Sequence, residues 1–122
     1  MREYQRELEE GLRYSKVVRG VIDYIDSHYT HANLGIEDIA EYMHLSSAHL
    51  SVLFKQETGA TIKQYISDYR LELSKKMLAN EHYKINEIAE LCGYSNANYF
   101  AKVFKAANDQ SPVEYRKNCG IE

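Results

Sequence analysis

The chain contains nearly the same stretch of sequence twice, and this internal repeat limits the folds that it can adopt. The segment IEDIAEYMHLSSAHLSVLFK starts at Ile36, and INEIAELCGYSNANYFAKVFK starts at Ile85. The first halves of the two segments match at an offset of 85 − 36 = 49 residues, and after one extra residue the second halves match at 100 − 50 = 50. Self-similarity of this kind indicates that one supersecondary unit is built twice.

Each copy has the pattern of a helix-turn-helix motif. Apolar residues recur at helical spacing in a short helix and again in a second helix, with a tight turn between them. We pair Ser46 with Ser95 and expect each serine to cap the second helix of its copy. The second helix of such a motif enters the major groove of DNA. Two copies therefore predict one polypeptide that reads two stretches of duplex.

The rest of the chain predicts further helices and no strand. Apolar spacing indicates helices over about 14–29 and 61–79, and Ser111, Pro112 and Glu114 form a capping box that starts a last helix. The total is seven helices, an all-α fold. We expect a first helix-turn-helix lobe at 14–60, a connecting helix at 61–79 and a second lobe at 80–122. Residues 1–13 are interpreted as a linker helix or a tail.

Composition excludes several classes of protein. No apolar run is long enough to cross a membrane, and the start of the chain lacks the features of a signal peptide. The two cysteines, Cys92 and Cys119, are too few for a disulfide framework, so we expect a cytoplasmic protein. The five histidines show no zinc-like spacing, and no nucleophile, base and acid come together. We predict no metal, no cofactor and no enzyme, with Cys92 and His49 packed in the core.

The formal net charge of −3 argues against a nucleic-acid partner, because DNA-binding proteins are usually basic. The charge is uneven, however. Residues 1–44 carry 5 basic and 9 acidic side chains, whereas residues 45–122 carry 10 and 9. The local field over the binding face matters more than the total. A second hypothesis is a helical protein-interaction module that has lost DNA binding and docks a partner through an acidic surface.

The segment IAELCGYSNANYFAKVFK, followed by SPVEYR, resembles the DNA-binding domain of AraC-type (AraC/XylS) bacterial transcription regulators. The first copy and YISDYRLELSKKML resemble the same family, so the likeness covers about 14–117, and its wording is closest to the subgroup fused to response-regulator receiver domains. The resemblance implies two helix-turn-helix lobes joined by a long helix, with recognition helices in successive major grooves. It further implies double-stranded DNA as partner, a sensor or receiver domain upstream in the same polypeptide, and RNA polymerase as a partner of the whole activator.

The chain departs from the family pattern at two kinds of position. Asp109 stands where the family usually has glycine, and His44 stands where the second copy has Gly93. Aspartate tolerates the left-handed conformation better than most residues, so we expect that turn to survive. Small side chains occupy the outer face of the first recognition helix, where the family often has large polar or basic residues. This difference predicts weak base readout by the first lobe.

The candidate base contacts lie on the outward faces of the second helices. In the second copy we expect Tyr99, Phe100, Val103 and Phe104 to face the core, which leaves Asn96, Ala97, Asn98, Ala101 and Lys102 outward. An asparagine can pair bidentately with adenine, and a lysine can reach a guanine or a phosphate. In the first copy the candidates are Ser47, Ala48, Ser51 and Val52. They either meet thymine methyl groups or belong to a lobe that only positions the protein.

The candidate phosphate contacts are the two matched serines, Ser46 and Ser95, the two lysines that end the second helices, Lys55 and Lys105, and two arginines, Arg70 and Arg116. Lysine at the end of a helix also complements the helix dipole. The arginines are assigned by the family resemblance, and isolated surface arginines serve as often in ion pairs.

Overall fold

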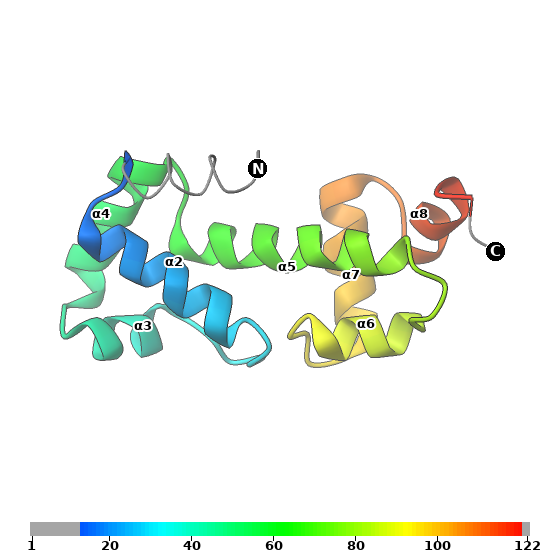
Figure 1. Cartoon of the computed structure of the whole chain (residues 1–122), viewed down its shortest axis with the longest axis horizontal. Helices are drawn as coiled ribbons and strands as arrows, with labels where there is room; N and C mark the ends of the chain where they lie inside the picture. Colours follow the sequence, from blue (N-terminus) through cyan, green and yellow to red (C-terminus); the bar gives the residue numbers. More distant parts are fainter. Residues whose placement is uncertain (1–12, 121–122) are drawn as a thin grey trace, which may run out of the picture. The chain divides into compact units, whose positions relative to one another are not determined.

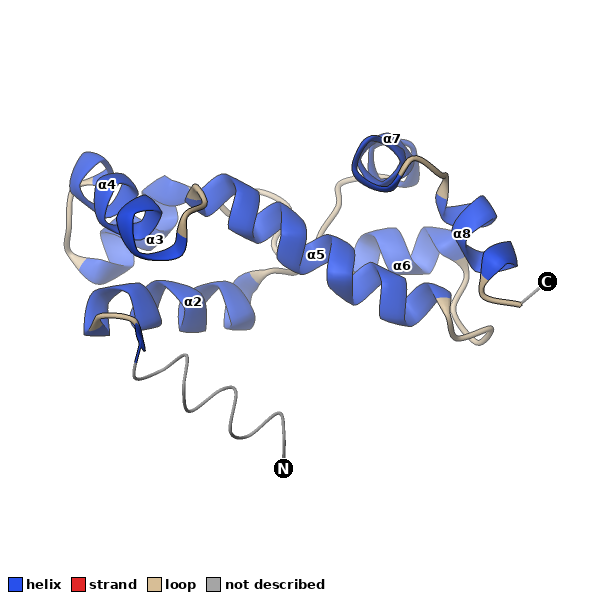
Figure 2. Ribbon diagram, turned by 90° about the horizontal axis from the view of Figure 1, so that it is seen from above, coloured by secondary structure: helices blue, strands red, loops and turns tan. Residues whose placement is uncertain are grey.

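The computed structural model of the chain describes residues 13–120. Within that range the chain forms seven helices and no strand, as predicted (Figures 1 and 2). The helices are α2 (Lys16–His28), α3 (Ile36–Met43), α4 (Ser47–Thr58), α5 (Ile62–Leu78), α6 (Ile85–Leu91), α7 (Ala97–Asn108) and α8 (Pro112–Asn118). The predicted linker helix or tail at residues 1–13 lies almost wholly outside the described residues.

The described residues divide into two compact lobes. The first lobe comprises 13–28 and 34–66, and it holds α2, α3, α4 and the first turn of α5. The second lobe comprises 29–33 and 67–120, and it holds the rest of α5 together with α6, α7 and α8. Residues 29–33, which connect α2 to α3, therefore group with the second lobe.

The core of the first lobe is wholly aliphatic except for one phenylalanine. Its buried side chains come from all four helices and are Val18, Val21, Ile25, Ile39, Ala40, Leu50, Phe54, Ile62 and Ile66. Helices α2, α3 and α4 pack on one another in pairs. Because α2 presents its buried residues at spacings of three and four, one stripe of that helix faces the helix-turn-helix motif.

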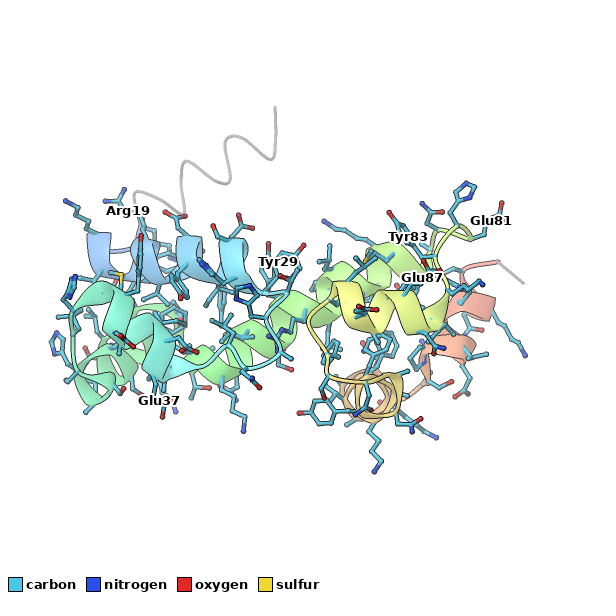
Figure 3. All side chains as sticks on the ribbon, turned by 90° about the horizontal axis from the view of Figure 1, so that it is seen from below. Arg19, Tyr29, Glu37, Glu81, Tyr83 and Glu87 are labelled. Carbon is cyan, nitrogen blue, oxygen red and sulfur yellow. The ribbon has the colours of Figure 1, made fainter. Side chains whose placement is uncertain are left out.

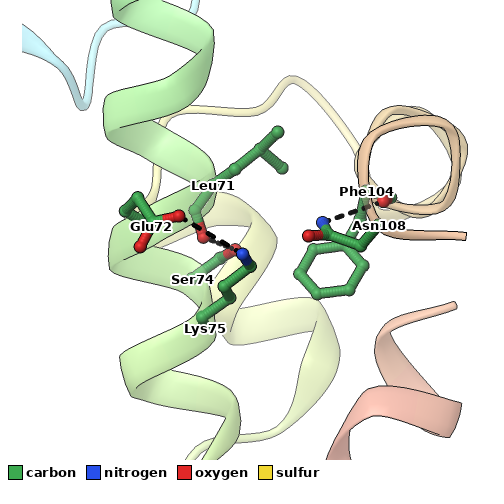
Figure 4. Close-up of polar contacts among 6 residues, drawn as sticks. All are labelled: Leu71, Glu72, Ser74, Lys75, Phe104 and Asn108. Atoms are coloured by element: carbon green, nitrogen blue, oxygen red, sulfur yellow. Dashed lines mark hydrogen bonds and ion pairs between the residues drawn. The ribbon is translucent and has the colours of Figure 1, made fainter. Parts of the chain in front are cut away.

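The second lobe has a richer aromatic core. Its buried cluster is Leu71, Leu78, Ile88, Ala89, Cys92, Tyr94, Phe100 and Phe104. Ser74 on α5 is fully buried, and its hydroxyl donates to the Leu71 carbonyl at 2.7 Å (Figure 4). The hydroxyl finds its acceptor within α5, so the buried Ser74 side chain has no unpaired donor.

The repeat extends past the segment that the sequence comparison identified. Phe54 packs edge-on against Tyr65 with ring centroids 5.5 Å apart, and Phe104 packs edge-on against Tyr115 at the same distance. Both pairs are related by 50 residues. The edge-to-face arrangement suits the quadrupoles of the two rings. Each copy is therefore a motif of three helices. The third, α5 in the first copy and α8 in the second, packs a tyrosine on the core phenylalanine of the helix-turn-helix and is called the closing helix below.

Reciprocal capping recurs at the start of these closing helices. The Thr61 hydroxyl accepts from the Gln64 N–H, and the Gln64 side chain accepts from the Thr61 N–H, both at 3.0 Å. Ser111 and Glu114 repeat the arrangement 50 residues later, at 3.1 and 3.0 Å, which confirms the predicted capping box. The hydrogen bonds from Ser111 lower the pKa of Glu114, because they favour the charged carboxylate.

Of the five residues with positive φ between 13 and 120, four end helices or turns of the two helix-turn-helix copies. Gly59 ends α4 at φ 82°, and Asp109 ends α7 at φ 59° in the place usually taken by glycine. His44 (φ 57°) and Gly93 (φ 92°) occupy equivalent positions in the two helix-turn-helix turns. The turn geometry therefore survives both substitutions of glycine, as expected from the tolerance of the left-handed region.

Replacing Gly93 should destabilise the protein more than replacing Gly59. A Cβ at position 93 would lie 2.0 Å from the backbone oxygen of Tyr29, whereas one at position 59 would meet nothing within 4 Å. We expect Gly59→Ala to lower the free energy of unfolding by about 1 kcal/mol, the cost of a left-handed alanine. Gly93→Ala adds about 1–3 kcal/mol for overpacking. Urea denaturation of both variants measures the difference, and equal losses would contradict the close approach.

Candidate nucleic-acid interface

The residue that caps the N-terminus of α4 is the predicted one, but the residue that caps α7 is not. Ser46 caps α4, and its hydroxyl accepts from the His49 N–H at 3.1 Å. In the second lobe the cap is Asn96, whose side-chain oxygen accepts from the Tyr99 N–H at 2.8 Å. The prediction that Ser95 caps this helix is wrong. Ser95 is instead the extra residue of the second copy, and the true partner of Ser46 is Asn96.

This one-residue difference has a physical cause that the sequence left ambiguous. Serine and asparagine are about equally good N-caps, so SN before a helix allows two starting points. In the structure the helix begins at Ala97, and both Phe100 and Phe104 are fully buried. The amide oxygen of Asn96 is committed to the cap, which removes half of the bidentate pair that adenine requires.

The outward face of α7 includes Asn98, Lys102 and Lys105, which are all exposed. Three of the residue assignments on this helix were wrong. Ala101, expected to face outward, is half-buried. Ala97 is half-buried against the core of the second lobe rather than outward. Tyr99, expected in the core, is 54% exposed. Phe100, the next residue along the helix, is fully buried.

The outward face of α4 has the same register but smaller side chains. Ala48, Ser51, Val52 and Lys55 are exposed, with Val52 at 59%, whereas Ser47 is half-buried. His49 was expected to pack in the core and is exposed. It lies 50 residues before Tyr99, so the same position was misassigned in both copies. The polar ring of His49 is the signal that could have corrected both assignments.

Arg70 and Arg116 were assigned to phosphate contacts from the sequence, but in the structure their guanidinium groups donate hydrogen bonds to backbone carbonyls of the chain itself. Within the second lobe Arg70 donates to Tyr29 at 3.0 Å and to His31 at 2.7 Å. Arg116 donates to Leu78 at 3.0 Å, to Asn80 at 3.3 Å and to Tyr83 at 2.6 Å.

Each guanidinium group therefore holds a loop by hydrogen bonds. Arg70 binds the loop after α2, and Arg116 binds the loop after α5. Burial lowers the pKa of Arg70. Figure 3 labels Tyr29 and Tyr83, which supply carbonyls of the two loops.

Beside Arg70 lies the turn of the second motif. The Arg70 guanidinium carbon is 5.9 Å from the centre of the Tyr94 ring. Tyr94 is buried, and its hydroxyl has no hydrogen-bond partner, so burial raises its pKa. Burial also raises the pKa of Cys92 to about 11, although Arg70 opposes the shift. The buried thiol confirms the prediction that Cys92 is structural.

Charge is segregated between the two helices of each motif. The first helices carry acidic side chains, which are Glu37, Asp38 and Glu41 on α3 and Glu87 and Glu90 on α6. Figure 3 labels Glu37 and Glu87. The second helices carry lysine, and α7 has no acidic residue. On α4 the single acid, Glu57, accepts the Ser15 N–H at 2.7 Å. The net negative charge is thus compatible with two lysine-bearing outward faces.

Other kinds of site find no support in the described residues. Between residues 13 and 120 no group of three or more histidine, cysteine, aspartate or glutamate side chains could hold a metal ion. In the same range no helix combines the length and apolar character that a membrane span requires.

The chain is similar in sequence and in structure to known proteins. The family model of the helix-turn-helix domain matches residues 39–118. A solved structure, the C-terminal domain of the response regulator AraT from Geobacillus stearothermophilus, is similar with a TM-score of 0.84 and 35% identity. That match covers 87% of this chain and 88% of the AraT domain.

Two curated relatives come from Escherichia coli strain K12. The uncharacterized HTH-type transcriptional regulator YijO is 35% identical over 91% of this chain and 39% of its own length. The arabinose operon regulatory protein is 31% identical over 84% of this chain and 35% of its own length. The chain thus spans somewhat more than a third of the length of these relatives.

Truncating Asn96 should destabilise α7, whereas truncating its neighbour should not. Asn96→Ala removes the acceptor of the Tyr99 N–H, and loss of an N-cap costs about 1 kcal/mol. Ser95→Ala leaves the cap intact and should stay within about 0.5 kcal/mol of the parent. Thermal unfolding of the two variants separates the alternatives. A greater loss of stability for Ser95→Ala than for Asn96→Ala would mean that Ser95 is the cap. The assignment of residues to the outward face would then have to move by one position.

Proposed function

The chain belongs to the AraC-type helix-turn-helix family, and we propose that it binds double-stranded DNA sequence-specifically, as the output domain of a transcription regulator. The observation that carries the proposal is the matched pair of capped helices, α4 and α7. Each presents an exposed face that ends in a lysine, and the helix before it carries most of the acidic side chains of the motif. Such a face fits a major groove, where phosphates flank the base edges.

The two faces support a division of labour between base contacts and phosphate contacts. Asn98 and Lys102 lie four residues apart on one strip of α7 and are proposed to reach base edges. Ala48, Ser51 and Val52 on α4 offer only a hydroxyl and small apolar groups, so the first lobe reads fewer positions. Lys55 and Lys105 are proposed to bind phosphates, together with the exposed N-terminal turns of α4 and α7.

We assign Arg70 and Arg116 an indirect part in this function. Their guanidinium groups hold loop carbonyls of the second lobe, so we propose that they fix the helix-turn-helix motif rather than contact phosphate.

The wider setting is proposed from the relatives. AraT is named a response regulator and the arabinose protein an operon regulatory protein. We propose that this chain likewise acts in the bacterial cytoplasm beside a sensor or receiver domain of the same polypeptide. We further propose that the whole protein influences RNA polymerase at a promoter as an activator.

Mutation of the second lobe separates base contacts from phosphate contacts. On duplexes selected from a random pool, Asn98→Ala should relax preference at one base pair, at a cost of about 1–3 kcal/mol there. Lys105→Ala should weaken binding to all duplexes alike and reduce the slope of log affinity against log salt by about one. If Ser51→Ala or Val52→Ala changed the preference while Asn98→Ala did not, the first lobe would be the main reader.

The same binding series tests the rival hypothesis of a protein-interaction module. Steep weakening of binding between about 50 and 200 mM salt is required for DNA by counterion release. Absence of salt-dependent binding to any duplex would favour the rival.

The spacing of the DNA site offers a second test. Because both motifs belong to one polypeptide, one chain should occupy one asymmetric site of two parts, with recognition helices in successive major grooves about 34 Å apart. Inserting about five base pairs between the parts turns one of them to the opposite side of the duplex and should abolish tight binding. Unchanged affinity for the five-pair insertion would contradict two-groove binding.

A further inference from the structure

The position of Tyr99 carries an inference that rests on the proposed DNA binding and adds a residue to it. Tyr99 is 54% exposed on the first turn of α7, although the core of its lobe is rich in aromatic residues. An exposed aromatic ring on a helix is not stabilised by burial. The equivalent residue in the first lobe, His49, is also an exposed ring with a hydrogen-bonding group. The position therefore keeps a polar ring at the surface in both copies.

The helical register places Tyr99 at one edge of the outward face. At about 100° per residue, Tyr99 and Lys105 point about 120° apart, and Asn98 and Lys102 lie between them. Tyr99 and Lys105 are thus the two flanks, Lys102 lies midway between them, and Asn98 lies about 20° from Lys105. An α-helix is about as wide as the major groove, so its flanks meet the phosphates of opposite strands.

The surroundings of Tyr99 hold its ring in place without occupying its hydroxyl. Its ring lies 6.2 Å from that of Tyr94, which in turn packs on Phe100 at 5.0 Å. The backbone N–H of Tyr99 is bound by the Asn96 cap, so the first turn of the helix is fixed beneath the ring. A ring ordered before binding loses little conformational entropy when it meets a partner.

We propose that Tyr99 is a positioning residue, whose phenol hydroxyl donates a hydrogen bond to a DNA phosphate on the strand opposite the one bound by Lys105. The contact sets the rotation of α7 in the groove and carries no sequence information itself. It differs from the lysine contact in charge. A neutral phenol releases no counterion, so it contributes affinity without contributing to the salt dependence.

The test compares Tyr99→Phe with the parent on the selected duplex and on an unrelated duplex, across a salt series. We expect affinity to fall about tenfold on both duplexes, as for loss of one hydrogen bond to a charged group, with an unchanged salt slope. Tyr42→Phe is the matched control, because Tyr42 is 61% exposed on α3 and lies outside the interface. That variant should bind like the parent. Both variants keep their rings, and equal melting temperatures verify that they fold.

The outcomes distinguish this inference from the proposed function. If the parent binds DNA and Tyr99→Phe binds equally well, the phosphate contact is overturned while the function stands. A changed preference at one base pair would make Tyr99 a base reader and overturn its positioning role. A parent that binds neither duplex overturns both proposals.

Discussion

Burial of one phenylalanine on the second helix of each motif fixes the rest of the arrangement. Phe54 and Phe104 are fully buried, and each packs edge-on against a tyrosine of the closing helix. The Phe54 carbonyl also accepts a hydrogen bond from the Thr58 hydroxyl at 2.8 Å. The Phe104 carbonyl accepts one from the Asn108 side chain at 3.0 Å (Figure 4). Because a helix has a fixed period, turning this ring inward determines which residues face outward.

The buried ring also explains why two very different outer faces share one geometry. Small side chains on α4 and larger polar ones on α7 stand at matched positions, 50 residues apart, around the same inward residue. The sequence of the outer face can therefore vary without any change in packing. One scaffold can hold a strong reader and a weak reader in the same chain, which is the asymmetry proposed for the two lobes.

Much of this structure could be predicted from local patterns. The existence and order of the seven helices, the left-handed positions of His44 and Asp109 and the capping box at Ser111 follow from spacing and cap chemistry, and the structure confirms them. The cap at Asn96 could not be predicted, because serine and asparagine compete for it and only packing decides. The roles of Arg70 and Arg116 were hidden for another reason. Their acceptors are backbone carbonyls 33 to 41 residues away, which carry no side-chain signal.

The central claim is that DNA meets the outward faces of α4 and α7 rather than the acidic first helices. Backbone amide shifts of isotope-labelled protein, followed by NMR while a selected duplex is added, test it most directly. The account predicts that the largest changes fall within 46–55 and 96–105, with smaller ones in α3 and α6. Largest changes at Glu37, Glu41 and Glu90, with α4 and α7 unaffected, would contradict the account and assign the interface to the acidic surface.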